Sequence, residues 1–455
     1  MPAARRRRSP LLPCLWTVVA AISATMLPVM AADSNWNQFR GPGARGIASG
    51  RIPERWSATE NVEWKAELPG MGWSSPVVWG NRVFLTTVVS ERQPEPPKKG
   101  LYFGGDRPTP PGDTHQWKAL CLDLRSGRKL WETSLHSGAP ASSRHLKNSF
   151  ASETPVTDGE RLYVLFGNLG LYALDLNGKL LWKRPIAPRK TRLGWGTAAS
   201  PTLHEGRLYV VNDNEEESYL EALEARSGRQ IWRVARDEKS NWATPYVWRN
   251  SRRTELVTPG SGLVRSYDLN GRLLWSLEGM SSITIGTPYA EGDTLFVSSG
   301  YVGSPLRPLY AIKAGGEGNI SIGRDQTSGP FVTWCDWRGA PYNPTTLLAN
   351  GRLFVLFDFG FLAAYHAGTG RMLFDKVRIP EGLRFTASPW AAGDKIYCLN
   401  EDGKTFVFKN SDRYDLTHTN SLAEDDMCMA TPALAGDRLL IRTAARLYSI
   451  RERRP

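Results

Sequence analysis

The stretch that decides the fold reads Ser152-Glu153-Thr154-Pro155-Val156-Thr157-Asp158-Gly159, then Leu162-Tyr163-Val164-Leu165, Leu171-Tyr172-Ala173-Leu174-Asp175 and Asn177-Gly178-Lys179-Leu180-Leu181-Trp182. Its aromatic and β-branched runs are typical of strands. The Asp-Gly and Asn-Gly pairs supply the positive φ that tight hairpin turns require. The stretch therefore predicts four short antiparallel strands, the first opening at a proline and the last ending in a tryptophan.

This four-strand unit returns about every 45 residues along the chain. The opening prolines are Pro76, Pro155, Pro201, Pro245, Pro288, Pro344, Pro389 and Pro432. Two of the intervals, 79 and 56 residues, contain insertions, and the other five are 43 to 46 residues long. A regular repeat of four strands is the signature of one propeller blade. The sequence thus predicts an all-β fold, an eight-bladed β-propeller of four-stranded antiparallel blades.

The eighth repeat lacks its last strand. It opens at Pro432 and ends after a third strand near 447–450, whereas Asn61-Val62-Glu63-Trp64, ahead of the first repeat, has the pattern of a blade-ending strand. We expect the N-terminal strand near 61–66 to close the last blade, because an open sheet edge is a liability. Residues 32–455 are therefore predicted to form a single propeller domain.

Tryptophans recur at the end of the fourth strand, namely Trp64, Trp131, Trp182, Trp232 and Trp275. A large aromatic side chain repeated at one position of every blade is expected to pack between blades with its N–H group satisfied. Direct contact with a ligand is the alternative role.

Residues 1–31 have the layout of a signal peptide. Arg5 to Arg8 form a basic segment, Leu15 to Leu27 an apolar one, and Val29-x-Ala31 suits a cleavage site. The apolar segment is short for a membrane-spanning helix. We expect cleavage and export to the periplasm or cell envelope, with no transmembrane span in the mature chain.

The charge of the chain is moderately basic. The net charge is +12, and residues 1–31 carry four arginines and no acid, so the mature chain is near +8. The charges are spread between blades without a long Lys/Arg run, which argues against nucleic acid as a partner and is compatible with an anionic one.

Three copies of the hairpin motif identify a family resemblance, at Ala119 to Trp131, Ala173 to Trp182 and Ala222 to Trp232. They resemble the quinoprotein (PQQ-type) propeller repeat, and the resemblance covers essentially the whole mature chain. Trp36 to Pro42 and Asn61 to Lys65 are similar to a narrower group, the exported PQQ-binding-like propellers of planctomycete-type bacteria. The resemblance implies fold and location, because this repeat serves several activities.

The resemblance also implies one enzymatic alternative, a PQQ-dependent quinoprotein dehydrogenase of reduced form. Such enzymes hold the quinone between a tryptophan and a vicinal Cys-Cys disulfide, with Ca²⁺ on Glu, Asn and Asp ligands and a nearby Asp as base. Here the mature cysteines are far apart in sequence: Cys121, Cys335, Cys398 and Cys428. No position matches the metal ligands, so pyrroloquinoline quinone with Ca²⁺ stays an alternative, and no metal site is predicted.

Other chemistry is weakly signalled. Asp213 to Glu217 and Glu424 to Asp426 gather the oxygens that Ca²⁺ prefers, although a solvated hairpin is the favoured interpretation of the first run. No nucleophile motif or zinc spacing is present, so no catalytic residue is predicted. Carboxylates from different blades leave a polysaccharide-active enzyme as a third hypothesis.

A ligand site is expected at one end of the central channel, where the loops before the first strands converge. The candidate residues in these loops are His145, Asn148, Trp195, Arg236, Glu238 and Trp242. Trp195 lies between two glycines and is either a stacking platform for a sugar or a quinone, or a plug of the channel. The proline-rich insertion, Ser90 to Gln116, should overhang the same face, whereas the second insertion, Gly315 to Gly339, is known by position only.

These observations favour a non-catalytic binding or scaffolding module of the cell envelope. In blade architecture it is similar to the propeller lipoprotein that scaffolds outer-membrane β-barrel assembly. The expected partner is an envelope protein, a glycan or a small molecule at the top face of the propeller, and the protein is expected to be a monomer.

Overall fold

The computed structural model describes residues 1–4, 35–48, 50–102, 104–422 and 426–452. Contacts divide the chain into two units, Met1–Ala31 and Ala32–Pro455. The predicted signal peptide lies almost entirely outside the described residues. Within the described ranges, no helix is long and apolar enough to cross a membrane.

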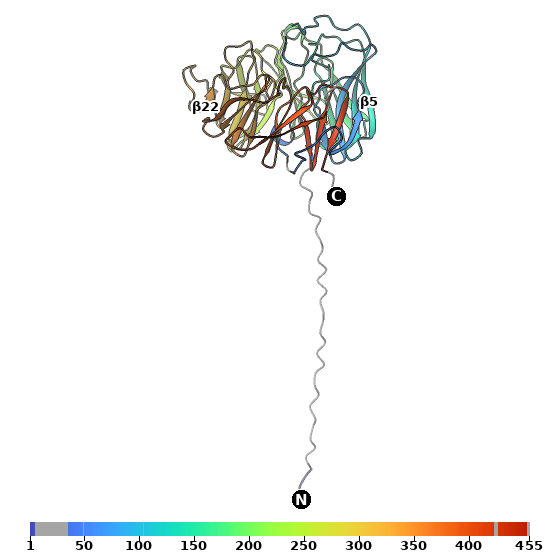
Figure 1. The fold of residues 1–455 in the computed structure, drawn as a ribbon, viewed down its shortest axis with the longest axis vertical. Coiled ribbons are helices and arrows are strands. Elements are labelled where there is room, and N and C mark those ends of the chain that lie inside the picture. The colour runs from blue at the N-terminus through green and yellow to red at the C-terminus, as the bar shows by residue number, and fades with distance from the viewer. Residues whose placement is uncertain (5–34, 49, 103, 423–425, 453–455) are drawn as a thin grey trace. The chain divides into compact units, whose positions relative to one another are not determined.

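The second unit is an eight-bladed β-propeller of four-stranded antiparallel sheets, as predicted (Figure 1). Blade one contains β2(Val77–Trp79), β3(Arg82–Ser90), β4(His115–Asp123) and β5(Lys129–Gly138), and blade two contains β6(Val156–Thr157), β7(Arg161–Phe166), β8(Gly170–Asp175) and β9(Leu180–Pro185). Blade three contains β10(Thr202–His204), β11(Arg207–Asn212), β12(Tyr219–Glu224) and β13(Gln230–Ala235), and blade four contains β14(Tyr246–Arg249), β15(Thr254–Pro259), β16(Leu263–Tyr267) and β17(Leu273–Glu278). Blade five contains β18(Tyr289–Glu291), β19(Thr294–Ser298), β20(Leu309–Lys313) and β22(Val332–Asp336). Blade six contains β23(Leu347–Ala349), β24(Arg352–Phe357), β25(Phe361–His366) and β26(Met372–Arg378). Blade seven contains β27(Trp390–Ala392), β28(Lys395–Leu399), β29(Lys404–Lys409) and β30(Leu416–Ser421).

The eighth blade is closed by the N-terminal strand, which confirms the prediction. β1(Val62–Glu67) pairs antiparallel with β33(Arg446–Ile450), next to β32(Arg438–Arg442) and β31(Ala433–Ala435). The buried Arg442 adds a second link, because its guanidinium donates to Ser74 Oγ at 2.6 Å and to the Thr86 carbonyl at 2.9 Å in the first blade.

The recurring tryptophans pack between blades, as expected. Trp131 in β5 donates its indole N–H to the Leu176 carbonyl of the next blade at 2.9 Å. Its ring covers Gly178, at φ +88°, where an added Cβ would lie 2.7 Å from the indole. Trp64, Trp182, Trp232 and Trp334 repeat this contact on Gly127, Gly228, Gly271 and Gly370.

Trp275 is the exception among the predicted tryptophans. Its N–H donates to the buried Glu255 carboxylate at 2.6 Å, not to a carbonyl of the next blade. The second insertion accounts for the difference, because it adds the short parallel strand β21(Gly318–Asn319) beside β17.

The sequence predicts Pro344 as the opening proline of blade six, but the first strand opens two residues later. In blade six, Thr345 occupies the Ser/Thr position and Thr346 the proline position, because Thr345 hydrogen-bonds to Thr287 on one side and to Ser388 on the other. Pro344 therefore lies in the preceding loop, since the repeat requires only an extended backbone at this point.

The N-terminal arm, residues 35–48, crosses the end of the channel opposite the loops that precede the first strands. Trp36 forms a β-bridge with Val78 of blade one, and Ile47 forms one with Ala391 of blade seven. The 3₁₀ turn η1(Pro42–Ala44) between them lies against β18 of blade five. The Trp36 to Pro42 motif thus belongs to a segment that plugs the channel.

Arg40 anchors this plug at the centre of the ring. It is fully buried, and its guanidinium donates to the carbonyls of Ala44 (2.9 Å), Thr346 (2.9 Å), Arg45 (3.2 Å) and Pro389 (3.3 Å). It also lies over the Tyr289 ring. Burial lowers the pKa of Arg40 to about 10.

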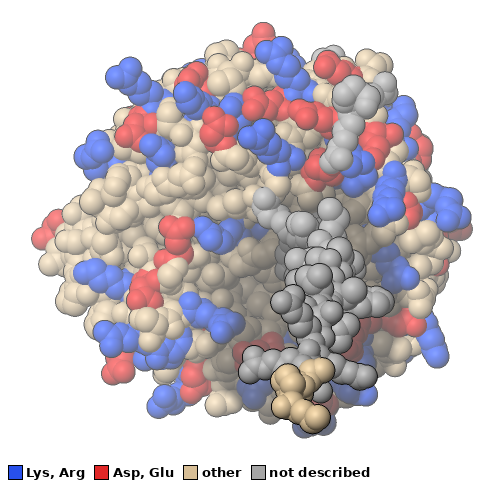
Figure 2. Space-filling model, turned by 90° about the horizontal axis from the view of Figure 1, so that it is seen from below, with Lys and Arg blue, Asp and Glu red and all other residues tan. Residues whose placement is uncertain are grey.

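The apolar core lies between neighbouring blades. One buried cluster, for example, joins Val77 and Phe84 of blade one to Leu162 and Val164 of blade two. On the face seen in Figure 2, basic and acidic side chains are interspersed around a large uncharged area. The visible surface therefore carries no single-sign patch.

Candidate functional site

A circle of eight hydroxyl groups surrounds the channel where the first strands begin, which we call the top face. Its members, one from each blade, are Ser75, Thr154, Ser200, Thr244, Thr287, Thr345, Ser388 and Thr431. At six of the eight junctions, the backbone N–H of one member donates to the hydroxyl oxygen of the next, at 2.9–3.1 Å. Each such bond consumes an acceptor site and leaves the hydroxyl hydrogen to be donated.

The hydroxyl circle lines a cavity of about 530 Å³ at the top end of the channel. This volume lies in the range of small-molecule sites. Phe39 of the N-terminal arm lines this cavity and also a second one of about 460 Å³ at the other end of the channel. Phe39 therefore forms part of the floor that separates the two.

One wall of the top cavity is aromatic. The ring centroids of Tyr102 and His145 are 5.6 Å apart, those of His145 and Trp195 are 5.8 Å apart, and those of Trp195 and Trp242 are 5.8 Å apart. Trp195 and Trp242 are only partly buried. The Trp242 N–H donates to the Gly196 carbonyl at 2.8 Å. These two indoles thus present ring surface to the cavity while their N–H groups are already bonded.

The first insertion, residues 91–114, lies over this cavity and we call it the strap. Trp195 donates its indole N–H to Asp106 Oδ1 at 2.5 Å, and Leu146 donates its backbone N–H to the Gly105 carbonyl at 2.7 Å. At the other side, Gly100 donates its backbone N–H to Glu401 Oε2 of blade seven at 2.6 Å. The strap is therefore held to blades two, three and seven at once.

A buried ion pair supports the strap. Lys147 Nζ lies 2.6 Å from Glu401 Oε1 and donates to the Gly100 carbonyl at 3.0 Å. The Glu401 side chain is 1 % exposed, and it also accepts a hydrogen bond from the Thr386 hydroxyl. Such a pair is stable only while both partners are present, because an unpaired buried charge is costly.

His145 lines the cavity as a neutral side chain. Burial lowers its pKa to about 4. Its Nδ1 accepts the backbone N–H of Lys147 at 3.1 Å, which places the ring proton on Nε2. Gly105 of the strap packs so closely on this ring that an added Cβ would lie 1.9 Å from Nε2.

Asn148 joins two loops of the top face. Its amide nitrogen donates to the carbonyls of Trp195 (2.8 Å) and Thr197 (3.1 Å), and its amide oxygen accepts from Ser149 N and Ser152 Oγ, both at 2.7 Å. Because these bonds occupy both donors and both acceptor sites, Asn148 positions Trp195.

Arg236 and Glu238 do not line the cavity, unlike the other four candidate residues. The Arg236 guanidinium is fully buried against Asp213, at 2.8 and 3.1 Å, and it also donates to the Thr258 hydroxyl. Glu238 accepts from Arg265 and from Ser261 N. The two residues therefore belong to an ion cluster between blades three and four.

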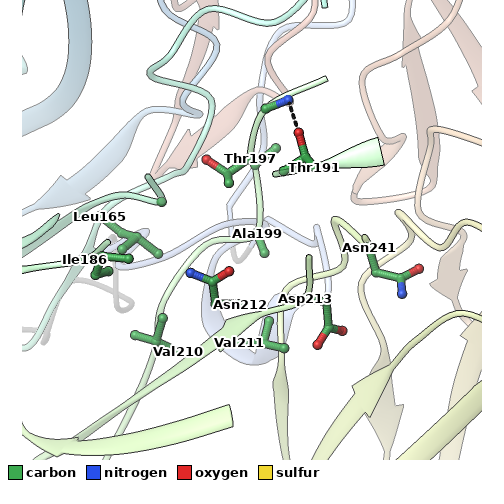
Figure 3. Close-up of a pocket in the computed structure, with 13 residues that line it drawn as sticks. Leu165, Ile186, Thr191, Thr197, Ala199, Val210, Val211, Asn212, Asp213 and Asn241 are labelled. Atoms are coloured by element: carbon green, nitrogen blue, oxygen red, sulfur yellow. Dashed lines mark hydrogen bonds between the residues drawn. The ribbon is translucent and has the colours of Figure 1, made fainter. Parts of the chain in front are cut away.

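A smaller hollow lies between blades two and three (Figure 3), lined in part by Val210, Asn212 and Asp213 of the β11 end. Its volume is about 20 Å³, which is room for about one water molecule. The hollow is too small for an organic ligand.

The acidic run from Asp213 to Glu217 is spread over separate partners. Asp213 pairs with Arg236, Glu217 with Arg189, and Glu215 accepts from Ser240. In the described part of the chain, no group of three or more His, Cys, Asp or Glu side chains could hold a metal ion. Of the second run, residues 424 and 425 lie outside the described residues.

The residues do not fit the quinone that the repeat family implies. The four cysteines among the described residues are separate, buried, free thiols, and burial raises the pKa of Cys121 and Cys335 to about 12. Among the described residues lining the cavity, the only Lys or Arg is Lys147, which is paired with Glu401. The described lining residues therefore offer the carboxylates of a quinone no uncommitted cation, and Arg192, which lies over the Tyr301 ring, is not one of them.

Fold and site together define an eight-bladed propeller with PQQ-like repeats and a ligand-sized cavity in its channel. The chain belongs to the family described as outer membrane protein assembly factor BamB, whose model matches residues 55–194 and 118–300, more than half of the chain. No curated protein matches the chain.

Solved structures show the same fold at low sequence identity. The quinohemoprotein alcohol dehydrogenase of Comamonas testosteroni has a TM-score of 0.59 and 10% identity, with 93% of this chain and 82% of that chain covered. The quinohemoprotein alcohol dehydrogenase ADHIIG of Pseudomonas putida HK5 has a TM-score of 0.54 and 12% identity, with 93% of this chain and 82% of that chain covered. The computationally designed Ika8 protein has a TM-score of 0.53 and 9% identity, with 89% of this chain and 99% of that chain covered.

Sequence reasoning missed the hydroxyl circle, Asp106, the Lys147–Glu401 pair and the floor residue Phe39. A signal for the circle was present, because a Ser or Thr precedes seven of the eight opening prolines. Asp106 and Glu401 carry no such signal, since they lie far from their partners in sequence.

Proposed function

We propose that this protein is an exported binding module of the cell envelope that holds a small ligand in the top cavity beneath the strap. The observation that carries the proposal is the cavity of about 530 Å³, lined by residues from all eight blades and by a partly exposed aromatic wall. The leader-like residues 1–31 and the family description support an envelope location.

The residues favour binding over quinone-dependent oxidation. The one Lys of the described lining residues, Lys147, is paired with Glu401, and Asp106 Oδ1 accepts the Trp195 indole N–H. The described residues offer neither a vicinal disulfide nor a metal-ligand cluster. A reaction that needs the quinone and its metal has no support in this arrangement of side chains.

The test is a ligand-observed NMR fragment screen on the mature chain and on a variant with a filled cavity, Ala198→Trp. Ala198 lines the cavity, so the larger side chain should abolish fragment binding. A calorimetric titration with pyrroloquinoline quinone, with and without Ca²⁺, runs in parallel.

The proposal predicts fragments that bind the mature chain and not the filled variant, and no saturable quinone binding. Equal fragment binding to both proteins would overturn it. So would micromolar quinone binding that requires Ca²⁺, which would favour the dehydrogenase.

A further inference from the structure

We infer that the ligand of the top cavity is an uncharged ring polyol, that is, a neutral sugar. The inference rests on the proposed function and adds the chemical class of the ligand. Three features carry it: the aromatic wall, the hydroxyl circle and Asp106, which is the one carboxylate among the described residues that line the cavity.

The aromatic wall suits the flat C–H faces of a sugar ring. Trp195 and Trp242 are partly exposed and lie 5.8 Å apart at an angle of 37° between their planes. Two blades further round the ring, Tyr301 of blade five and Tyr342 of the loop before blade six form a second aromatic pair with centroids 5.3 Å apart. A pyranose in the cavity can therefore pack an apolar face on either aromatic pair.

The hydroxyl circle suits the edge of such a ring. Among the described residues, no acceptor is found for the hydroxyl hydrogens of its eight members, although all eight side chains are buried. Six of the eight hydroxyl oxygens accept a backbone N–H, and a hydroxyl that accepts can still donate its own hydrogen to a further partner. Sugar hydroxyls are acceptors as well as donors, so they can receive these hydrogens.

Asp106 supplies the complementary acceptor. Its Oδ1 accepts the Trp195 indole N–H, and no ion-pair partner is found for its carboxylate among the described residues. Oδ2 can then accept from ligand hydroxyls. The same carboxylate repels anionic ligands, and the engaged Lys147 cannot compensate for it.

The experiment measures affinity for methyl glucoside, galactoside, mannoside and N-acetylglucosaminide, and for methyl glucuronide as the charged counterpart, by calorimetry on the mature chain. We expect at least one neutral glycoside to bind, and the glucuronide to bind at least tenfold more weakly than the glucoside. This comparison of neutral and charged glycosides is made on the natural sequence and needs no substitution. For the sugar that binds, a second titration with its oligosaccharide shows whether the natural ligand is a free monosaccharide or the end of a glycan.

The variant Asp106→Asn should weaken neutral-sugar binding about tenfold and narrow the gap between glucoside and glucuronide. Asp113→Asn, also on the strap but outside the cavity, is the matched control and should leave both affinities unchanged. Asn can still accept the Trp195 N–H, so the strap should remain in place.

The outcomes separate the two proposals. Fragments that bind the cavity while every neutral glycoside fails would overturn the sugar class and leave the binding module intact. A glucuronide that binds as tightly as the glucoside would also overturn the class. If neither fragments nor sugars distinguish the mature chain from Ala198→Trp, the binding module itself fails.

Discussion

Arg40 is a single residue that ties three parts of the ring together. Its described hydrogen-bond partners are all carbonyl oxygens, from the arm and from blades six and seven. In Arg40→Met these buried carbonyls lose their donors, and we expect a loss of about 3 kcal/mol in the free energy of unfolding. Urea denaturation measures it.

Arg45→Met is the matched control for Arg40→Met. Arg45 pairs with Glu291 at the surface, where its side chain is 38% exposed. Exposed ion pairs contribute about 0–1 kcal/mol. Similar losses in the two variants would contradict the role assigned to Arg40.

His145 makes the stability of the top face dependent on pH. Burial lowers its pKa to about 4, a shift that Asp106 opposes and that Lys147, Arg107 and Arg144 reinforce. The unfolded chain binds the proton near pH 6.5, so the stabilising contribution is complete above that pH and is lost as the pH falls toward 4.

The non-titrating variant His145→Gln tests this dependence. We expect its melting temperature to fall less than that of the natural chain between pH 7 and pH 4.5. Other titrating groups act equally in both proteins, so an identical fall would show that His145 does not contribute.

At the scale of elements, the turn between the third and fourth strands is the unit of blade contact. Gly178→Ala places a methyl group at φ +88° and 2.7 Å from Trp131, so both backbone strain and a clash with the indole result. Gly262→Ala, at φ +81° with nothing within 4 Å, produces the backbone strain alone. We expect the Gly178 variant to be about 2 kcal/mol less stable than the Gly262 variant.

Chemical denaturation of the two glycine variants measures the difference. Equal free energies of unfolding for Gly178→Ala and Gly262→Ala would mean that Trp131 can move away from residue 178 without loss of stability. Other contacts would then hold the blades together.

At the scale of the whole molecule, stability depends on closing the ring. A chain that begins at Trp73 lacks β1 and leaves β33 with an unpaired edge, so we expect it to aggregate. A chain that begins at Trp56 lacks the arm and keeps β1, and it should stay monomeric by size-exclusion chromatography. Aggregation of both chains to the same extent would assign the effect to the arm.

The order of the strands was predictable because each blade is built from contacts close in sequence. The Pro-opened strand, the Gly turns and the blade-ending tryptophans all recur with one period, and periodicity is visible without coordinates. The misplaced opener Pro344 shows the limit, because Thr346 fills that position without a proline. The loops that precede the first strands were found in the same way, but position in such a loop is not enough: Trp242 lines the cavity, whereas Arg236 and Glu238 of the same loop do not.

By itself, the sequence determined the eight-bladed fold, the closing strand and the face on which loops converge, since these follow from repeats and hairpin turns. Only the tertiary structure decided the chemistry of the cavity. Asp106 meets Trp195 across 89 residues and Lys147 meets Glu401 across 254, whereas Arg236 turns into an ion cluster. Such pairings depend on how blades and strap meet in space, which no local pattern encodes.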